Sequence, residues 1–396
     1  MTPPARLLDL TRLIRRAGRV MTGVDRVEFA YLQALSAGSV PCWGLVRTRL
    51  GYVLLPPDAL PEVAARLQGT LPWPAPTGLS RLARGHSPVQ RAALTFIRSV
   101  ATWRGVPALL GRKLSRQLPE GTDYFNIGHS NLTDRVLSAA KALGGRSHVF
   151  IHDVIPIDFP QYQRAETVRT FEAKLRRVQA NADTVICNSA DTAQRTAQIM
   201  GAWGDAPRII VSHLGTNLTA PAPAEVPDGL IPPGPFFVTL GTIEPRKNHA
   251  LLLDIWDRLG SGAPHLLILG ARGWSNDAVF ARLDARPDST KIKEVAGLSD
   301  GAVADILRRA NGLLFPSFAE GYGLPAVEAA ANGVPVIASD LPVFREVLGN
   351  IPVYASPHDG YQWEKAIKAR AQHRQTPPPF DPPSWEAHFK VVLTVP

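Results

Sequence analysis

The chain has 396 residues, more than one hydrophobic core usually supports, so two domains of roughly 150 to 200 residues are expected. With 45% apolar and 19% charged residues it has the composition of a soluble globular protein. It has no run of about 18 apolar residues and no signal-peptide pattern, which predicts a cytoplasmic protein. The net charge of +9 indicates an anionic partner, while Cys42 and Cys187 offer neither a disulfide framework nor the spacing of a metal site.

The N-terminal half alternates short apolar runs with helical patterns. It opens with a predicted strand at 5–11, a basic turn, and a helix for which Thr22 is a suitable N-cap. Asn126 ends one later strand, and His152 and Asp153 end another. These three are candidate site residues, because ligands of open α/β sheets bind beyond the carboxyl ends of the strands. Further strands are expected at 40–46, 52–55, 124–127, 148–153, 184–189 and 208–212, and helices at 166–181 and 191–200.

Residues 63–119 carry nine basic side chains and no acidic one, a charge equal to the excess of the whole chain. A helical pattern from about Pro88 to Leu118 places Leu, Ile and Trp on one side and arginines on the others. Two interpretations remain open: a helix lying on an anionic membrane surface, or a solvated basic face packed on its own domain. Nucleic acid is disfavoured, because no helix-turn-helix, zinc or single-strand-binding signature accompanies the charge. The nine residues are Arg66, Arg81, Arg84, Arg91, Arg98, Arg104, Arg112, Lys113 and Arg116.

A Pro-rich segment separates the two halves, because residues 219–235 hold six prolines in 17 residues, as semi-rigid linkers do. We therefore expect a first domain at 1–218, a linker at 219–235 and a second domain at 236–375, with a C-terminal segment at 376–396 packing back towards the first domain. Strands and helices alternate again after the linker, so both domains are expected to be doubly wound α/β folds. Strands are expected at 236–240, 265–269, 292–296, 312–315 and 334–338, and helices at 250–259, after 276, at 301–311 and from 384.

The most informative stretch runs from the strand at 312–315 through a turn into an alanine-rich helix. Gly321 and Gly323 keep the turn free of side chains, so the unpaired N–H groups of the helix start form a ready anion site. Glu320 and Glu328 bracket this site. Eight residues separate them by about 12 Å or more, too far for the paired carboxylates of a glycosidase. The two glutamates are therefore expected to contact different parts of one long ligand, and a carboxylate is well suited to holding a ribose.

A second loop supplies cations. Residues 241–249 follow a strand and precede a helix, and they place Arg246 and Lys247 beside a glycine turn. Arginine grips phosphate oxygens bidentately and lysine adds a point charge, so the pair could neutralise a diphosphate leaving group. The chain has no dinucleotide fingerprint, no Walker A loop, and no Asp-x-Asp pair of the kind that clamps a nucleotide diphosphate through a metal ion. We therefore expect no cofactor and no metal.

Together these motifs resemble those of glycosyltransferase family 4, a large family of retaining enzymes with the GT-B fold. The Glu-x7-Glu spacing of residues 320–328 carries the resemblance. The loops at 241–248 and 270–274 are most similar to bacterial mannosyltransferases that build O-antigen and exopolysaccharide chains. The resemblance implies two Rossmann-like domains that face each other across a cleft and close over a nucleotide-sugar donor. Further matches occur at 22–26, 151–156 and 188–189.

The resemblance also implies roles for the residues of the Glu-x7-Glu stretch and its surroundings. Glu320 would contact the donor sugar, Glu328 would hold the ribose, and His152 would lie near the transferred sugar. Glu320 and His152 are thus the expected catalytic residues. Further donor-binding candidates are Gly321, Tyr322, Gly323 and Leu324, and additional candidates are Asp153, Arg272 and Asn126.

The diphosphate of the donor would be bound from both domains. By the resemblance, Arg246 and Lys247 would face it, and Gly23 would let the N-terminal domain approach it closely. Many relatives carry an arginine directly after the glycine that matches Gly241, whereas this chain has Thr242. Either Arg246 takes over that role, or diphosphate binding is weaker than usual.

The resulting hypothesis is a metal-independent, retaining transferase. It would move a hexose, with mannose from GDP-mannose as the best candidate, onto a lipid-linked or growing cell-surface glycan at the inner face of the plasma membrane. No nucleophile or base is evident, so we expect front-face displacement in which the departing diphosphate takes the acceptor proton. A UDP-sugar-dependent transferase of the same fold and a non-catalytic, membrane-associated scaffold are the alternatives.

Overall fold

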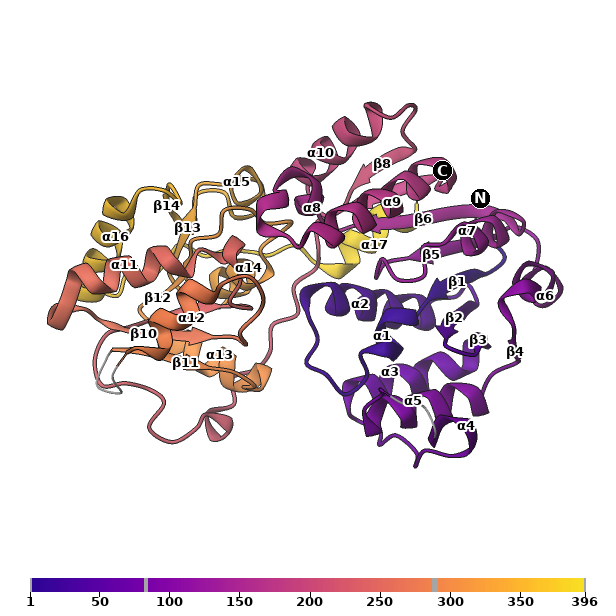
Figure 1. Cartoon of the computed structure of the whole chain (residues 1–396), viewed down its shortest axis with the longest axis horizontal. Coiled ribbons are helices and arrows are strands. Elements are labelled where there is room, and N and C mark those ends of the chain that lie inside the picture. Colours follow the sequence, from indigo (N-terminus) through magenta and orange to yellow (C-terminus); the bar gives the residue numbers. More distant parts are fainter. Residues whose placement is uncertain (1, 82–84, 287–290, 395–396) are drawn as a thin grey trace.

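The structure is a computed structural model that describes residues 2–81, 85–286 and 291–394, and these form two α/β domains (Figure 1). The N-terminal sheet has the strand order β4-β3-β2-β1-β5-β6-β7-β8, and the C-terminal sheet has the order β11-β10-β9-β12-β13-β14. Of the basic residues counted above, Arg84 lies outside the described residues.

In the N-terminal sheet, all pairings from β2 across to β8 are parallel, while β3 and β4 are added at one edge in antiparallel fashion. The strands are β1 (Arg6–Asp9), β2 (Cys42–Thr48), β3 (Gly51–Leu55), β4 (Trp103–Gly105), β5 (Thr122–Asn126), β6 (Gly144–Ile151), β7 (Thr184–Cys187) and β8 (Arg208–Val211). The helices are α1 (Thr11–Arg15), α2 (Gly23–Ala37), α3 (Leu60–Gln68), α4 (Gly78–Arg81), α5 (Pro88–Ser99), α6 (Leu110–Gln117), α7 (Asp134–Lys141), α8 (Ile155–Asp158), α9 (Ala165–Asn181) and α10 (Ala190–Gly201).

The C-terminal sheet is parallel throughout, and its strand order reverses between β9 and β12. This is the doubly wound order in which ligands bind at the reversal point, beyond the carboxyl ends of the strands. Its strands are β9 (Phe236–Leu240), β10 (His265–Leu269), β11 (Ile292–Val295), β12 (Gly312–Phe315), β13 (Val336–Ser339) and β14 (Val353–Ala355). Its helices are α11 (His249–Leu259), α12 (Asp277–Asp284), α13 (Asp300–Arg309), α14 (Leu324–Ala331), α15 (Pro342–Leu348) and α16 (Gly360–Gln372).

The predicted long helix from Pro88 to Leu118 is wrong. The segment instead forms α5, the edge strand β4, and α6. Gly105 and Pro107 interrupt the helical pattern, because glycine weakens a helix interior and proline lacks the N–H that a helix interior needs. The basic turn predicted after the first strand also contains a short helix, α1.

The apolar side of α5 is buried inside the N-terminal domain. Ala93 and Ile97 have no exposed surface, and Phe96 is also buried. An apolar face packed in the core is not available to a lipid bilayer, so the interpretation of this segment as a helix lying on a membrane by its apolar face is wrong. The alternative, a basic face packed on its own domain, describes α5 correctly.

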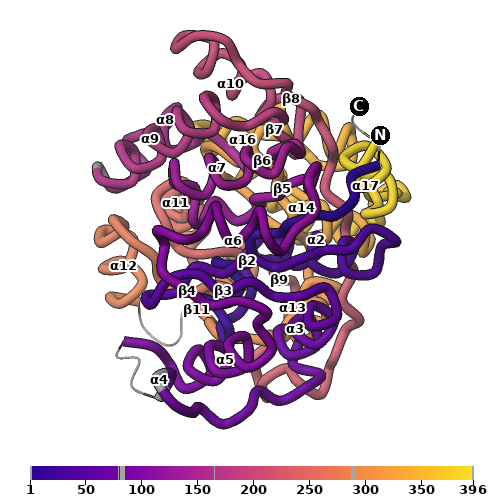
Figure 2. The backbone as a smooth tube through the Cα atoms, turned by 90° about the vertical axis from the view of Figure 1, so that its right-hand side faces the viewer, coloured from indigo at the N-terminus to yellow at the C-terminus, as the bar shows by residue number. Residues whose placement is uncertain are grey.

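The chain crosses between the domains twice. The Pro-rich linker leaves the N-terminal domain after β8, and the C-terminal segment returns to form α17 (Trp385–Leu393). His388 of α17 is buried beside α2, where its Nε2 lies 2.8 Å from the Tyr31 hydroxyl. Figures 1 and 2 both place α17 on the N-terminal domain, and Figure 2 shows it near the first residues of the chain. In the described part of the chain, no helix is both long and apolar enough to cross a membrane.

Candidate functional site

The loop that joins β12 to α14 brings the predicted Glu320 against the N-terminal domain. A Cβ atom on Gly321 would lie 2.4 Å from the His152 carbonyl oxygen, so only glycine lets the two backbones approach this closely. Gly323 has a φ of 88°, and a Cβ there would lie 2.4 Å from the Phe344 ring. The hydroxyls of Ser189 and Thr192 donate to the Gly321 carbonyl oxygen from the start of α10. The predicted residues His152 and Gly321 therefore meet at the contact between the domains.

Glu320 sits at the centre of a buried charge cluster. Its Oε1 accepts from Lys247 Nζ at 2.5 Å and lies 2.9 Å from Arg246 Nη1. Arg246 also pairs with Glu244 at 2.6 Å and donates to the Ala319 carbonyl oxygen at 2.7 Å. We call Arg246, Lys247, Glu244 and Glu320 the Glu320 cluster. Because β9 and β12 are neighbours at the point where the strand order reverses, the loops that follow them are placed to form one site.

The electrostatics of the Glu320 cluster keep its carboxylate charged. Burial by itself raises the pKa of Glu320, but the charges of Arg246 and Lys247 outweigh it and lower the pKa to about 2. Burial lowers the pKa of Lys247, and the charge of Glu320 opposes this shift. The pKa of Arg246 is raised, since the neighbouring carboxylates outweigh its burial. The cluster thus holds two cations that can bind an anionic group, and the carboxylates of Glu320 and Glu244 balance their charge when no such group is bound.

Gly241 and Thr242 lie beside these cations in different ways. Gly241 has a φ of 133°, and a Cβ on it would lie 3.5 Å from the Lys247 side chain. Thr242 is exposed and lies against Gly273, whose Cβ would come within 2.7 Å of the Thr242 methyl group. Of the two residues, Gly241 is the one in contact with Lys247.

His152 and Asp153 follow the carboxyl end of β6, and Asp153 faces the Glu320 cluster. His152 Nε2 lies 2.8 Å from the Ile127 carbonyl oxygen, and burial lowers the pKa of His152 to about 3. The ring is therefore neutral near pH 7, with Nε2 donating, and this suits it to positioning a ligand rather than to donating a proton. Burial raises the pKa of Asp153, although the charge of Arg246 opposes that shift.

The predicted Glu328, Gly23 and Leu324 form a second contact between the domains. Arg26 of α2 donates to Glu328 Oε1 at 2.7 Å and pairs with Asp300 at 3.0 Å. A Cβ on Gly23 would lie 3.5 Å from the Leu324 side chain. The N-terminus of α2, which is closed by a capping box between Thr22 and Asp25, thus lies against the start of α14. The sequence contained Arg26 only as part of a matching motif, and its pairing with Glu328 was not predicted.

Three of the predicted residues bind partners outside the Glu320 cluster. The exposed Arg272 pairs with Asp284 at 2.6 Å and with Glu294 at 2.9 Å, away from the Glu320 cluster. Asn126 is buried and donates to the Tyr124 hydroxyl and the Ser130 carbonyl oxygen. The Tyr322 hydroxyl donates to the Leu214 carbonyl oxygen at 3.1 Å, so this side chain joins the domains.

The two domains are closely packed around the Glu320 cluster. A cavity lined by Asp153 and Glu320 has a volume of about 50 Å³, whereas pockets for small-molecule ligands measure about 300–1,000 Å³. The Tyr162 and Phe318 rings stack across the domain contact with centroids 5.2 Å apart. Glu346 of α15 accepts from the backbone N–H groups of Ala190 and Asp191 at the start of α10. Among the described residues, no group of three or more His, Cys, Asp or Glu side chains is arranged to hold a metal ion.

Comparison with known proteins links this geometry to a family. Residues 227–368, which include the Glu320 cluster and Glu328, match the model of the glycosyl transferases group 1 family. The chain is 31% identical over 252 residues to the serotype-specific mannosyltransferase WbdA of Escherichia coli, a match that covers 59% of this chain and 30% of WbdA. It is 34% identical over 137 residues to the O-antigen chain mannosyltransferase RfbU of Salmonella typhimurium, covering 34% of this chain and 37% of RfbU. The chain therefore spans only about a third of the length of these curated relatives.

The solved structures extend the likeness to both domains. The structure of HepE from Anabaena in complex with UDP-glucose superposes with a TM-score of 0.62 over 98% of this chain and 94% of HepE, at 12% sequence identity. A likeness at this identity concerns the fold alone, and the fold is the predicted GT-B arrangement. Residues 227–368 are therefore similar to the group 1 glycosyltransferases, the two domains have the GT-B fold, and parts of the chain are similar to bacterial mannosyltransferases.

Proposed function

We propose that the chain is a glycosyltransferase that transfers a hexose from a nucleotide-sugar donor, with mannose from GDP-mannose as the first candidate. The observation that carries the proposal is the Glu320 cluster, where Arg246 and Lys247 from the loop after β9 meet Glu320 from the loop after β12. The choice of mannose is supported by the likeness to WbdA and RfbU, which are named as mannosyltransferases.

In the proposed reaction, Arg246 and Lys247 stabilise the negative charge of the departing diphosphate. The bond between the anomeric carbon and the diphosphate oxygen breaks, and the acceptor oxygen attacks from the same face. The acceptor proton passes to the departing diphosphate, and the anomeric configuration is retained. Glu320 orients the two cations and accepts hydrogen bonds from the sugar, and the neutral His152 holds the sugar from the other domain. Glu328 accepts hydrogen bonds from the ribose once Arg26 releases it.

The proposed acceptor is a lipid-linked or growing cell-surface glycan, and the proposed location is the inner face of the membrane. The net charge of +9 is consistent with an anionic partner of this kind. No metal takes part in the proposed reaction, because the cations of the Glu320 cluster do the work that a divalent ion does in other transferases.

The test is the release of nucleoside diphosphate from a panel of GDP-, UDP- and ADP-sugars by purified protein, with and without a mannoside acceptor. We expect GDP-mannose to be the preferred donor, activity to persist in EDTA, and NMR of the product to show the anomeric configuration of the donor. Preference for a UDP-sugar would support sugar transfer but contradict the choice of GDP-mannose as the donor. Release from no member of the panel would overturn the enzyme proposal.

Substitutions of the two cations in the Glu320 cluster test where the activity lies. Lys247→Ala and Arg246→Ala are each expected to lower kcat/KM by at least about 100-fold, because each removes a buried cation that faces the leaving group. Arg282→Ala is the matched control, because Arg282 pairs with Asp254 and Asp257 on an exposed surface. Circular dichroism and thermal unfolding show whether each variant is folded. Equal activity in folded Lys247→Ala and Arg282→Ala proteins would show that the Glu320 cluster is not the site.

A further inference from the structure

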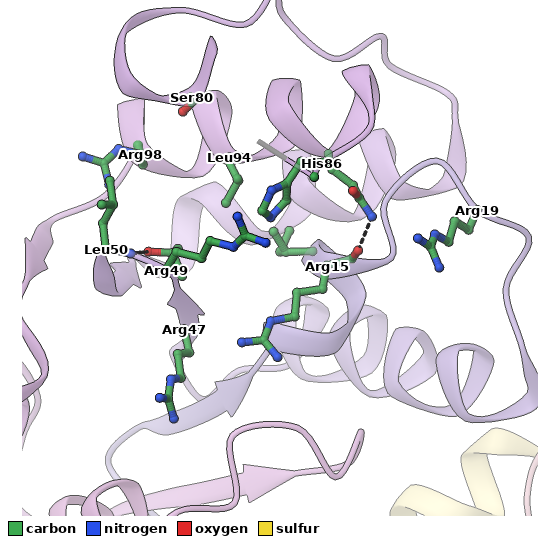
Figure 3. A pocket seen from close by; sticks show the side chains of 13 residues that line it. Arg15, Arg19, Arg47, Arg49, Leu50, Ser80, His86, Leu94 and Arg98 are labelled. Carbon is green, nitrogen blue, oxygen red and sulfur yellow. Dashed lines mark hydrogen bonds between the residues drawn. The ribbon is translucent and has the colours of Figure 1, made fainter. Parts of the chain in front are cut away.

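The N-terminal domain contains a second basic site that the proposed reaction does not use. It is a pocket with a volume of about 340 Å³, within the range of ligand pockets. Figure 3 shows arginine side chains from several elements around this space, with Arg49 reaching across toward His86. We call it the arginine pocket, and the lining residues that matter below are Arg15, Arg19, Arg47, Arg98, Leu50 and Leu94.

Four arginines of the arginine pocket have no acidic partner among the described residues. None of its lining residues is acidic. Within the described part of the chain, no carboxylate lies within ion-pair distance of Arg15, Arg19, Arg47 or Arg98. Arg12 and Arg16 of the same segment behave differently, because each pairs with Asp25 at 2.7 Å. The chain thus neutralises one side of α1 and leaves the other side for an outside anion.

The chemistry of the pocket favours a phosphate group over a carboxylate. Four guanidinium groups around one space repel each other, and a single carboxylate brings only one negative charge. A phosphate or diphosphate ester brings two or more charges on one compact group, with enough oxygens for several bidentate arginine contacts. The hydroxyl of Ser80, which also lines the pocket, is a hydrogen-bond donor of the kind that holds phosphate oxygens.

The pocket lies on the edge of the sheet that carries the proposed transfer site. Arg47 and Thr48 end β2, and Arg15 lies on α1, directly after β1. Strands β1, β2, β5 and β6 are parallel, so their carboxyl ends share one edge, and His152 follows β6 on the same edge. Three strand spacings separate β2 from β6, which corresponds to about 14 Å. One extended acceptor can therefore place an anionic group in the pocket and a hydroxyl near His152.

Apolar surface adjoins the charged part of the pocket. Leu94 lines it, and Leu50, at the turn between β2 and β3, is 58% exposed. Val106 is 54% exposed and lies beside this turn, because a Cβ on Gly51 would come within 3.3 Å of the Val106 Cα atom. Exposed leucine and valine at the mouth of a basic pocket suit a ligand that joins an anionic head to an apolar chain.

We propose that the arginine pocket binds the phosphate or diphosphate group of an amphiphilic acceptor, with the apolar chain lying over Leu50 and Val106. Its assignment to the acceptor rests on the proposed glycosyltransferase function. The binding of a phosphate-bearing amphiphile does not depend on that function, because it can be measured without any transfer reaction.

The test is calorimetric titration of the full chain with farnesyl diphosphate and with inorganic pyrophosphate. We expect farnesyl diphosphate to bind more tightly than pyrophosphate, and the double variant Arg47→Ala/Arg98→Ala to weaken farnesyl diphosphate binding by at least tenfold. The matched control is Arg112→Ala/Arg116→Ala, which removes the same charge from exposed positions on α6 in the same basic segment. Binding by the control is expected to stay within twofold of the wild type.

Three results would overturn the proposal: no binding of either probe, equal weakening by the two double variants, or binding of anionic phosphatidylglycerol vesicles alone. The last would assign the charge to a membrane surface. Equal affinity for the two probes would support a free diphosphate as the ligand and overturn the role of Leu50 and Val106.

Failure of the acceptor assignment can be told apart from failure of the proposed function. Nucleotide release from the donor, with and without a phosphate-free mannoside, is expected to be the same in Arg47→Ala/Arg98→Ala as in the wild type. If the wild type releases no nucleotide but the pocket binds farnesyl diphosphate, the proposed function fails and the phosphate site stands. If it releases nucleotide but the pocket does not bind, only the phosphate site fails.

Discussion

The Glu320 cluster and the arginine pocket use positive charge in opposite ways. In the cluster, the side chains of Arg246 and Lys247 are only 16% and 12% exposed, and Glu320 and Glu244 balance them within the chain. In the arginine pocket, Arg15 and Arg19 are exposed, Arg47 and Arg98 are half-buried, and none of the four has an acidic partner among the described residues. Burial makes the difference, because a charge removed from water needs a counter-charge, whereas an exposed one is screened by water and salt.

The largest effect is expected from Glu320→Gln, which leaves two buried cations with less counter-charge. We expect the free energy of unfolding to fall by about 3 kcal/mol at pH 7, as when one partner of a buried ion pair is removed. Urea unfolding followed by tryptophan fluorescence measures this change. The control is Asp284→Asn, which breaks a more exposed pair with Arg272 and is expected to cost far less, because water and salt screen an exposed pair. Equal effects of the two substitutions would mean that burial does not determine how much stability is lost when a carboxylate leaves its cation.

A second effect concerns Glu28, a fully buried carboxylate in α2 whose oxygens make no well-formed hydrogen bond among the described residues and have the Leu13 N–H as their nearest donor. Burial raises the pKa of Glu28 well above 4.5. The folded protein therefore holds a proton that the unfolded chain releases, so this contribution to stability is present below pH 4.5 and is lost as the pH rises.

We expect unfolding measurements between pH 4 and pH 8 to show the wild type losing about 1–3 kcal/mol relative to Glu28→Gln, the usual cost of a buried polar group without a partner. Parallel curves for the two proteins would show that Glu28 has a partner in solution. The comparison with Glu28→Gln thus tests whether a buried charge without a counter-charge lowers the free energy of unfolding outside the Glu320 cluster as well.

The ion pair between Arg26 and Glu328 is more exposed than the Glu320 cluster and less exposed than Arg15 of the arginine pocket, since its side chains are 33% and 20% exposed. A double-mutant cycle with Arg26→Ala and Glu328→Gln is expected to give a coupling energy of about 1 kcal/mol or less. The coupling should shrink between 0.05 and 0.5 M NaCl, because partly exposed pairs are screened by salt. A salt-independent coupling would show that this pair is shielded from salt in the same way as the Glu320 cluster.

The smallest effect is expected from Arg15→Ala in the arginine pocket. This residue is exposed and makes no ion pair among the described residues, so its loss should change the free energy of unfolding by no more than about 0.5 kcal/mol. The same urea titration measures it. A loss above 1 kcal/mol would mean that the pocket arginines stabilise the fold and are not held for a ligand.

The sequence predicted the C-terminal strands closely, because buried parallel strands leave continuous apolar runs. The predicted ranges 236–240, 265–269 and 312–315 are those of β9, β10 and β12. The prediction of one helix from Pro88 to Leu118 is wrong, because apolar residues recur at helical spacing on both sides of Gly105 although the chain forms a strand between the two helices. No elements were predicted for α15, β14 and α16.

For the site, the sequence identified the loops but not their contacts. Adjacent motifs were enough to select Glu320, Arg246 and Lys247, which lie within two loops. The ion pair of Arg26 with Glu328 joins residues 302 positions apart, and no local pattern reports on such a contact. The arginine pocket gathers residues from α1, the β2–β3 turn and α5, so only the folded chain brings them together. The predicted roles of Asn126 and Arg272 ignored the nearer partners that the fold gives them.

The double crossing between the domains limits how a ligand enters. The two crossings touch, because the Thr216 N–H donates to the Pro383 carbonyl oxygen at 3.0 Å and His388 Nδ1 lies 3.0 Å from the His213 carbonyl oxygen. Two chain segments joined side by side act as a single hinge, which allows the domains to rotate but prevents them from moving apart. We therefore expect the cavity beside Glu320 to widen by rotation of the domains about this hinge, with the ion pair between Arg26 and Glu328 opening while the hydrogen bond between Thr216 and Pro383 stays closed.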